Sequence, residues 1–314
     1  MSRIFDALQR AESERSGTDV GTLPQGPELL EFAERQAATE WKRDGGVSGS
    51  DGSGVVIDTQ TPDPTRILAD SGTVADLGRS TLLDRFPSTR ISLSAQSRLV
   101  SLTDRESPTA EAIRLLGVRL KDLRRSRPLK KLLITSTIPQ EGKSTIAANL
   151  ACTLSRATEE RTLLLEGDLR RPSLSRIFGI QRVPGICEYL RDEGASLSGI
   201  YHLEDAGPWI LPAGNAPSNP LELLQSPRLG VLMEQLSTLF DWIVVDSPPV
   251  LPLADTSVWM RVADGILLVT RQGTTEKQQL KKGLDALDSS KVLGAIMNGS
   301  IASAYSGYYY RATS

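Results

Sequence analysis

The stretch KLLITSTIPQEGKSTIAANLACTL constrains the fold more than any other part of the sequence. Its apolar run up to Ser136 is typical of a buried strand, and the Ala-rich segment from Lys143 is typical of a helix. The loop between them ends in Gly142-Lys143-Ser144-Thr145. Glycine lets the backbone approach an anion closely, and the amides and dipole of a following helix attract negative charge. The segment therefore predicts a phosphate-binding loop between a strand and a helix.

The residues at the end of this loop have expected roles in binding a nucleotide. Lys143 would reach the β and γ phosphates, and the Ser144 hydroxyl would ligate Mg²⁺. Backbone amides from Glu141 and Gly142 through Thr145 would contact the phosphates. The strict motif has glycine where this chain has Thr137, so the motif is a relaxed one. We expect ATP and Mg²⁺ as cofactors.

Acidic residues follow two other apolar runs, at the strand ends where open α/β sheets bind ligands. In LLLEGDLRRP, Glu166 and Asp168 stand two residues apart and could face one cleft, where Asp168 would also ligate Mg²⁺. Arg170 and Arg171 follow, and they could pair with phosphate or with these acids. The alternative is that this stretch is a solvated loop whose acids have no catalytic role.

The second acidic position is Asp246, at the end of the strongly apolar run DWIVVD. A carboxylate there could act on Mg²⁺ directly or through water, and the alternative is a simple cap at the strand end. With Lys143 and Ser144, the acids complete a set for phosphoryl transfer, which needs positioning and charge stabilisation.

Short apolar runs alternate with helical stretches from Lys131 onward, and this alternation predicts the fold class. We expect an α/β P-loop NTPase fold: a doubly wound, mostly parallel sheet with helices on both faces. The predicted domain spans residues 107–300, starting with a helix at EAIRLLGVRLKDLRR. A largely disordered N-terminal arm precedes it, with a short amphipathic helix at 1–16 and a Gly/Ser-rich linker at 17–106. The helix is either a frayed terminus or a docking element.

Composition narrows the remaining function classes. The net charge of −2 gives no global attraction to nucleic acid, so we expect no nucleic-acid partner. No apolar run reaches the length of a membrane span, and we expect the chain to be cytoplasmic. Cys152 and Cys187 lack metal-ligand spacing and are expected to be free thiols in or near the core.

Four of the six tyrosines lie in the last ten residues, in AYSGYYYRATS. They are Tyr305, Tyr308, Tyr309 and Tyr310, on a predicted flexible tail at 301–314. Such a tail could be an aromatic segment that associates non-specifically, a packed terminal strand or a set of phosphoacceptors. A phosphoryl-transfer site in the same chain favours the acceptor interpretation.

The motifs taken together resemble those of the bacterial tyrosine kinase family, the kinases of capsule and exopolysaccharide synthesis. The likeness covers roughly residues 107–311 and rests on EAIRLL, PQEGKST, LLLEGDLRRP, LPAGNAPSNPLELLQSP, FDWIVVDSPPVLPLAD, LGAIMN and the tyrosine cluster. The resemblance implies a tyrosine autokinase with catalytic Lys143, Glu166, Asp168 and Asp246. It also implies that Asn298 lies near the adenine.

The resemblance also implies partners. They are further copies of the chain, a membrane-spanning regulator of polysaccharide chain length that recruits the chain to the membrane, and a phosphatase. The family's ring-forming motif reads Glu-x-x-Arg-x-x-Arg, and Glu111 and Arg114 match it while Gly117 does not. Two further departures are Glu166 in place of the usual aspartate and Gln140 in place of a glycine.

Two alternatives share the predicted fold. A positioning ATPase, of the kind that partitions chromosomes or places the division site, would carry a second lysine where this chain has Ile138. A nucleotide-binding regulator with little phosphoryl transfer would be compatible with Glu166 and Gly117.

Overall fold

The computed structural model describes residues 82–94, 96–157, 160–181, 183–192, 197–251 and 253–299. The predicted helix at 1–16, the first part of the predicted linker at 17–81 and the tyrosine tail at 301–314 lie outside these residues. In the part that is described, none of the helices combines the length and the apolar character that a membrane crossing needs.

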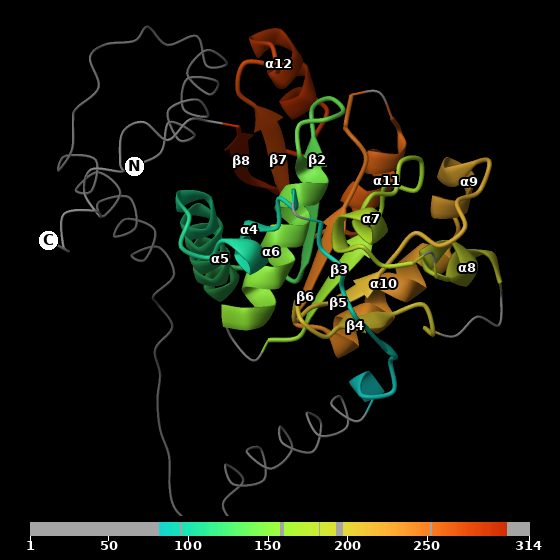
Figure 1. Ribbon diagram of the computed structural model, residues 1–314. Coiled ribbons are helices and arrows are strands. Elements are labelled where there is room, and N and C mark those ends of the chain that lie inside the picture. The colour runs from blue at the N-terminus through green and yellow to red at the C-terminus, as the bar shows by residue number, and fades with distance from the viewer. Residues whose placement is uncertain are drawn as a thin grey trace, which may run out of the picture. The chain divides into compact units, whose positions relative to one another are not determined.

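An eight-stranded sheet runs through the described residues (Figure 1). Its spatial order is β1-β4-β5-β3-β6-β2-β7-β8, and all neighbouring pairs are parallel except β4 and β5. The strands are β1 (Ser88–Thr89), β2 (Lys131–Ser136), β3 (Thr162–Glu166), β4 (Tyr201–Leu203), β5 (Trp209–Leu211), β6 (Trp242–Asp246), β7 (Gly265–Arg271) and β8 (Val292–Asn298). This topology confirms the predicted fold class.

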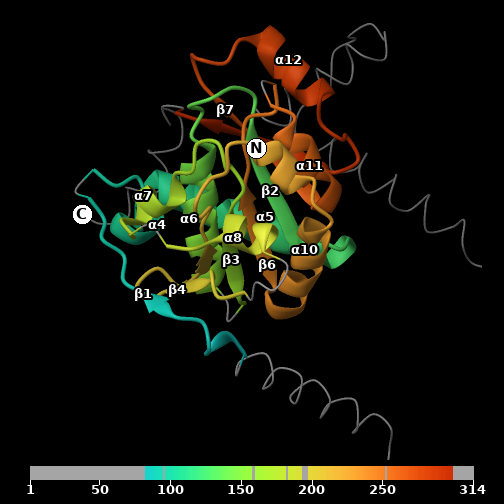
Figure 2. The ribbon, with the colours of Figure 1, turned by 90° about the vertical axis from the view of Figure 1, so that its right-hand side faces the viewer.

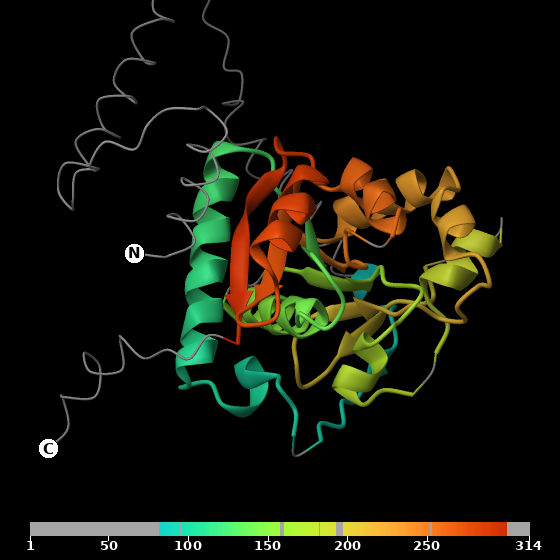
Figure 3. The ribbon, with the colours of Figure 1, turned by 90° about the horizontal axis from the view of Figure 1, so that it is seen from above.

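Helices cover both faces of the sheet. They are α4 (Val100–Thr103), α5 (Pro108–Ser126), α6 (Lys143–Ala157), α7 (Leu174–Phe178), α8 (Ile186–Arg191), α9 (Pro220–Leu224), α10 (Arg228–Leu239), α11 (Asp255–Val262) and α12 (Lys277–Asp285). The core consists of two apolar clusters. Helices α4 to α7 pack with the sheet in one cluster, and helices α8 to α12 pack with the sheet in the second. Figure 3 shows the long α5, in blue-green, on the side away from the yellow and orange helices.

The central strands are apolar throughout because both of their faces are buried. Leu132 and Ile134 of β2 belong to the cluster with α6, whereas Leu133 between them belongs to the cluster with α10 and α11. All three side chains are fully buried. Continuous apolar runs are therefore the expected sequence signature of such strands, since side chains alternate between the two faces. Both predicted free thiols, Cys152 and Cys187, are buried in these clusters.

The domain also includes residues 82–106, which the sequence analysis assigned to the linker. β1 extends the sheet by pairing with β4 (Figure 2). The Ser92 amide donates to the Phe178 carbonyl of α7 over 2.9 Å, and Leu99 is buried beside α6. Asn149 of α6 accepts hydrogen bonds from the amide and hydroxyl of Ser101. These contacts hold the segment against the helices that surround the phosphate loop.

α5 begins at a Ser107 side chain that caps the Ala110 amide, as its Ser-Pro-Thr-Ala-Glu start predicts. Its inner face packs on α6, and Gly117 lies on that face. A Cβ at position 117 would lie 3.7 Å from Leu154 and 3.8 Å from Thr153 of α6. The position that differs from the ring-forming motif therefore faces the protein interior.

Glu111 and Arg114, the two residues that match the ring-forming motif, lie exposed on α5. The Arg114 guanidinium donates to the Glu111 carboxylate and, over 2.6 Å, to the Arg105 carbonyl. An exposed pair of this kind adds little to stability.

Position 117 provides a stability test with two variants. Gly117→Ala should raise Tm by about 2–4 °C, because alanine is about 1 kcal/mol more favourable than glycine inside a helix and the added methyl has room. Gly117→Arg, which restores the motif, should lower Tm because its side chain must leave the α5–α6 contact. Thermal unfolding followed by circular dichroism measures both variants. An arginine variant as stable as the alanine variant would contradict this packing.

Candidate active site

The phosphate loop joins β2 to α6 and is held closed by Glu141. This side chain is fully buried, and its carboxylate accepts hydrogen bonds from the Ile138 amide, over 2.8 Å, and from the Thr275 hydroxyl. The sequence predicts that the backbone amide of Glu141 contacts the nucleotide, and this stays a prediction. The Glu141 side chain points into the loop and does not line the cavity, so its carboxylate shapes the loop.

Two residues of the loop have left-handed backbone conformations, Gln140 at φ 67° and Gly142 at φ 92°. The family's usual glycine is suited to position 140 because a residue with a Cβ is strained at positive φ. Asn298, at the end of β8, braces the loop by donating to the Glu141 carbonyl over 2.9 Å. A Cβ at Gly142 would lie 2.1 Å from the Asn298 amide nitrogen, so position 142 requires glycine.

Lys143 opens α6 and lies between two carboxylates. Its ammonium is 2.9 Å from an Asp168 oxygen and 3.6 Å from an Asp246 oxygen, and it is 3.3 Å from the Ser144 hydroxyl. Burial alone would lower the pKa of Lys143, but the nearby Asp246 and Asp168 charges outweigh it and raise that pKa. The lysine therefore stays charged in this buried position.

Asp246 lies at the end of β6, beside Ile134 of β2 and Glu166 of β3. The side chain is fully buried, and neither carboxylate oxygen accepts a close hydrogen bond from the described residues, while one oxygen forms a long ion pair with the Lys143 ammonium 3.6 Å away. Burial raises its pKa, while Lys143 acts in the opposite direction. Buried polar atoms in native proteins nearly always have a partner. A buried carboxylate beside a phosphate loop that has one long ion pair and no close hydrogen bond therefore fits a position that faces a hydrated cation.

The oxygen ligands near Asp246 suit a metal site in which the protein supplies some ligands and the nucleotide and water supply the others. Among the described residues, no cluster of three or more His, Cys, Asp or Glu side chains could hold an ion by itself. Mg²⁺ commonly uses one or two carboxylates together with water and substrate phosphates. Ser144, Asp168 and Asp246 fit that pattern.

Glu166 ends β3, but its carboxylate turns toward α7. One oxygen accepts from the amides of Ser173 and Leu174, each over 2.7 Å, while the other has no described hydrogen-bond partner. Burial raises the pKa of Glu166 well above its usual range, Asp246 raises it further, and the two amides only partly compensate. Glutamate at this position thus anchors the start of α7.

Asp168 and Arg170 lie in the loop after β3. One Asp168 oxygen accepts from the Arg171 amide over 3.0 Å, and the other contacts Lys143. The Arg170 guanidinium forms two hydrogen bonds, of 2.8 and 3.0 Å, with the carboxylate of Asp255, which is fully buried at the start of α11. The sequence predicts that Arg170 pairs with phosphate or with the nearby acids Glu166 and Asp168. In the structure it lines the cavity and pairs with Asp255 of another element.

These elements surround a cavity of about 800 Å³. Most of the predicted nucleotide-binding residues line it: Gly142, Lys143, Ser144, Thr145, Asp168, Arg170 and Asn298. Glu166 and Asp246 are buried and do not line it, although an Asp246 oxygen lies 3.6 Å from the Lys143 ammonium, which does. The cavity is also lined by Arg98, Thr109, Asn149 and Arg176, which sequence analysis did not single out. For Arg98, the sequence signal that was missed is the pair of apolar residues Leu99 and Leu102. Their spacing of three residues indicates that the segment around Arg98 packs against the domain.

Comparison with known proteins assigns this arrangement to a family. The chain is 34% identical over 220 residues to the tyrosine-protein kinase YwqD of Bacillus subtilis, covering 69% of this chain and 92% of YwqD. The chain belongs to the bacterial tyrosine kinases. No protein-family profile matches it.

Two further similarities agree with this family. The kinase domain of the Escherichia coli tyrosine kinase ETK superposes with a TM-score of 0.62 at 28% identity, covering 68% of this chain and 84% of that domain. The succinoglycan biosynthesis transport protein ExoP of Rhizobium meliloti is 38% identical over 53% of this chain, which spans 22% of ExoP. A protein-tyrosine kinase of this family uses ATP, and the similarity favours that function over a positioning ATPase.

The raised pKa of Glu166 gives a pH-dependent prediction for stability. The Glu166 carboxyl holds its proton to a higher pH in the folded protein than in the unfolded chain. As pH rises from the unfolded pKa toward the folded pKa, the unfolded chain loses this proton first, so the free energy of unfolding decreases. Glu166→Gln keeps an acceptor for the two amides and does not titrate. Its stability relative to wild type should therefore improve as pH rises above the usual glutamate range, by at most about 1.4 kcal/mol per pH unit.

Glu188→Gln is the matched control for this prediction. Burial alone would raise the pKa of Glu188, but hydrogen bonds from the Gly185 and Asn215 amides outweigh it and lower that pKa. Its contribution to stability is therefore lost only as pH falls below the usual glutamate range. Urea unfolding at several pH values should show a constant difference from wild type for this variant over the same window. A constant difference for Glu166→Gln as well would contradict the assigned shift.

Proposed function

We propose that the chain is an autokinase that transfers the γ-phosphoryl group of ATP to its C-terminal tyrosines, Tyr305, Tyr308, Tyr309 and Tyr310. The observation that carries the proposal is the placement of Lys143 between Asp168 and Asp246 at the mouth of the phosphate loop. The tyrosines lie outside the described residues, so their role rests on the sequence and on the family.

Lys143 and the loop amides would bind the β and γ phosphates. When ATP binds, the Lys143 ammonium would exchange its Asp168 contact for phosphate oxygens and stabilise the charge that builds up in the transition state. Mg²⁺ held by Ser144, Asp168 and Asp246 would neutralise further charge on the same oxygens. Asn298 would keep the loop in its binding conformation and face the adenine.

Asp168 is the acid best placed to orient the tyrosine hydroxyl and accept its proton. It lines the cavity, whereas Glu166 is buried behind the wall and uses one oxygen to hold α7. We therefore assign Glu166 a positioning role, although sequence analysis listed it with the catalytic acids. The longer side chain of glutamate, compared with the family's aspartate, gives it the reach to contact the α7 amides.

The wider role proposed for the chain is control of exopolysaccharide or capsule synthesis and export. ExoP is named as a succinoglycan biosynthesis transport protein, and the family resemblance points to the same process. The proposed partners are the cytoplasmic segment of a membrane-spanning chain-length regulator, a phosphatase and further copies of the chain. Recruitment to the membrane would depend on the regulator, and the exposed Glu111–Arg114 pair would contribute to self-association.

The direct test is to incubate the full chain with Mg-ATP and to locate phosphate by mass spectrometry. Phosphate should appear on the four C-terminal tyrosines. Lys143→Met should reduce the rate by at least about a hundredfold, because it removes a buried charge that stabilises the transition state. Lys281→Met, which changes an exposed lysine of α12 in the same way, should leave the rate unchanged.

Two results would contradict the proposal. One is phosphorylation that persists in Lys143→Met, because the cavity would then not be the active site. The other is the absence of tyrosine phosphorylation in the wild type even when a regulator's cytoplasmic segment is added, which would favour a nucleotide-binding regulator.

A further inference from the structure

The catalytic cavity carries more positive charge than its acids balance. Its lining holds one lysine and five arginines but a single carboxylate, that of Asp168. Three of these cations are engaged: Lys143 with Asp168, Arg170 with Asp255, and Arg271 with the Gln140 carbonyl. Arg98, Arg171 and Arg176 remain. No carboxylate of the described residues lies within ion-pair distance of these three guanidinium groups.

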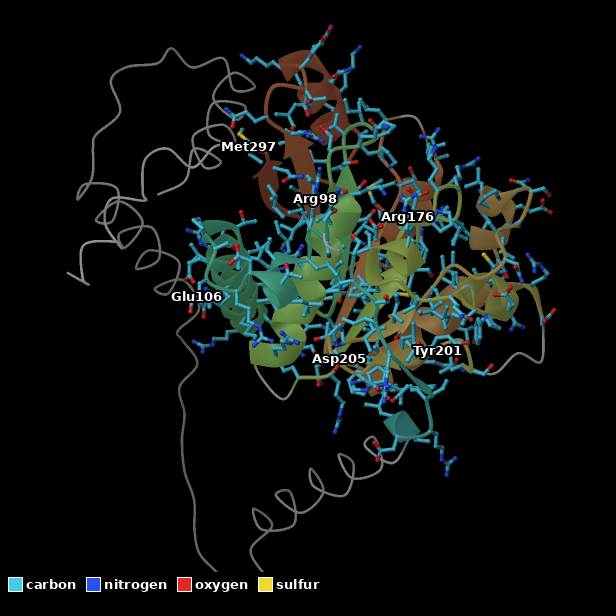
Figure 4. The ribbon with its side chains drawn as sticks, in the orientation of Figure 1. Arg98, Glu106, Arg176, Tyr201, Asp205 and Met297 are labelled. Atoms are coloured by element: carbon cyan, nitrogen blue, oxygen red, sulfur yellow. The ribbon has the colours of Figure 1, made fainter. Side chains whose placement is uncertain are left out.

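These three arginines, called the arginine wall below, come from two segments. Arg98 precedes α4, Arg176 is part of α7, and Arg171 lies in the loop that leads to α7. Figure 4 shows Arg98 and Arg176 at the same end of the domain, while Tyr201 and Asp205 lie at the opposite end. The arginine wall thus lies at the end of the sheet that carries the phosphate loop.

Both segments are tied to the catalytic elements by buried polar side chains. The Asn149 amide of α6 donates to the Arg98 carbonyl and to the Thr145 carbonyl, each over 2.9 Å, so it links the Arg98 backbone to the first turn after the phosphate loop. Glu166 holds the Ser173 and Leu174 amides and thereby fixes the start of α7. The arginine wall is therefore attached to a rigid frame.

Apolar side chains line the cavity beside these arginines. They are Val100, two residues after Arg98, Ile177, directly after Arg176, and Ile113 of α5. A surface that combines free guanidinium groups with apolar side chains suits a ligand with an aromatic ring and a dianionic phosphate. Arginine pairs with phosphate through charge-assisted, often bidentate hydrogen bonds.

We propose that the arginine wall is a subsite for phosphotyrosine on the acceptor segment, a proposal that rests on the autokinase function proposed above. The tail supplies such a group after its first turnover, because Tyr308, Tyr309 and Tyr310 are consecutive and Tyr305 is near. A phosphotyrosine held by the arginine wall presents a neighbouring tyrosine to Asp168 and the γ phosphate. The first phosphorylation thereby promotes the later ones.

The order of phosphorylation tests this subsite in the full chain. The variant is Arg98→Ala/Arg176→Ala, and the matched control is Arg125→Ala, an exposed arginine of α5 outside the cavity. Intact-mass spectrometry over time counts chains with zero to four tyrosine phosphates. In the double variant, the rate of each later phosphate relative to the rate of the first should fall by about tenfold or more, as expected for the loss of charge-assisted bonds. The control should match wild type at every step.

A binding measurement tests the subsite without turnover. Fluorescence anisotropy with a labelled peptide of residues 301–314 compares phosphate on Tyr309, phosphate on Thr313 and no phosphate. Wild type should bind the phosphotyrosine peptide at least about tenfold more tightly than the other two, and the double variant should lose that preference. This result does not depend on kinase activity, so it separates failure of the subsite from failure of the autokinase proposal.

Three results would overturn the subsite. If the double variant loses ATP affinity and slows every step equally, the arginines belong to the nucleotide site. If its phosphorylation series matches wild type, the arginine wall does not direct the acceptor. Equal binding of the phosphotyrosine and phosphothreonine peptides would reduce it to a general anion surface.

Discussion

The buried ion cluster of Lys143, Asp168 and Asp246 is the interaction on which the rest of the structure depends. Removing charges from water is unfavourable unless each has a partner, and here one ammonium faces two carboxylates at the carboxyl edge of the sheet. The strand order makes this possible, because β3, β6 and β2 are neighbours and their ends meet at the phosphate loop. The cluster is held in place for a ligand that brings negative phosphates and a cation.

The elements around the cavity are fixed to this cluster by a few polar side chains. Asn298 braces the phosphate loop from β8, and Asn149 ties the segment before α4 to α6. Glu166 anchors α7, and Arg170 connects the loop after β3 to α11 through Asp255. Hydrogen bonds of this kind hold catalytic groups in place before substrate binds, which is how electrostatic stabilisation of a transition state is prepared.

The sheet, the phosphate loop and the positions of the acids were predictable because they depend on local patterns. Continuous apolar runs indicate buried parallel strands, and Gly-Lys-Ser-Thr after such a run indicates a phosphate site. Contacts between distant segments were not predictable in this way. The direction of Glu166 toward α7, the inward position of Gly117 and the packing of residues 82–106 each depend on a partner far away in the sequence. The left-handed backbone of Gln140 likewise has no local signal.

We infer that Asp246, which has a long ion pair with Lys143 and no close hydrogen bond, completes a Mg-nucleotide site with that lysine. Isothermal titration of a non-hydrolysable ATP analogue, with Mg²⁺ or with a chelator, tests it in the wild type, in Asp246→Asn and in the exposed control Asp285→Asn. Mg²⁺ should tighten binding by about tenfold or more in the wild type and the control. Asp246→Asn should lose that increment while it keeps Mg-independent binding. An undiminished Mg²⁺ effect in Asp246→Asn would contradict the claim.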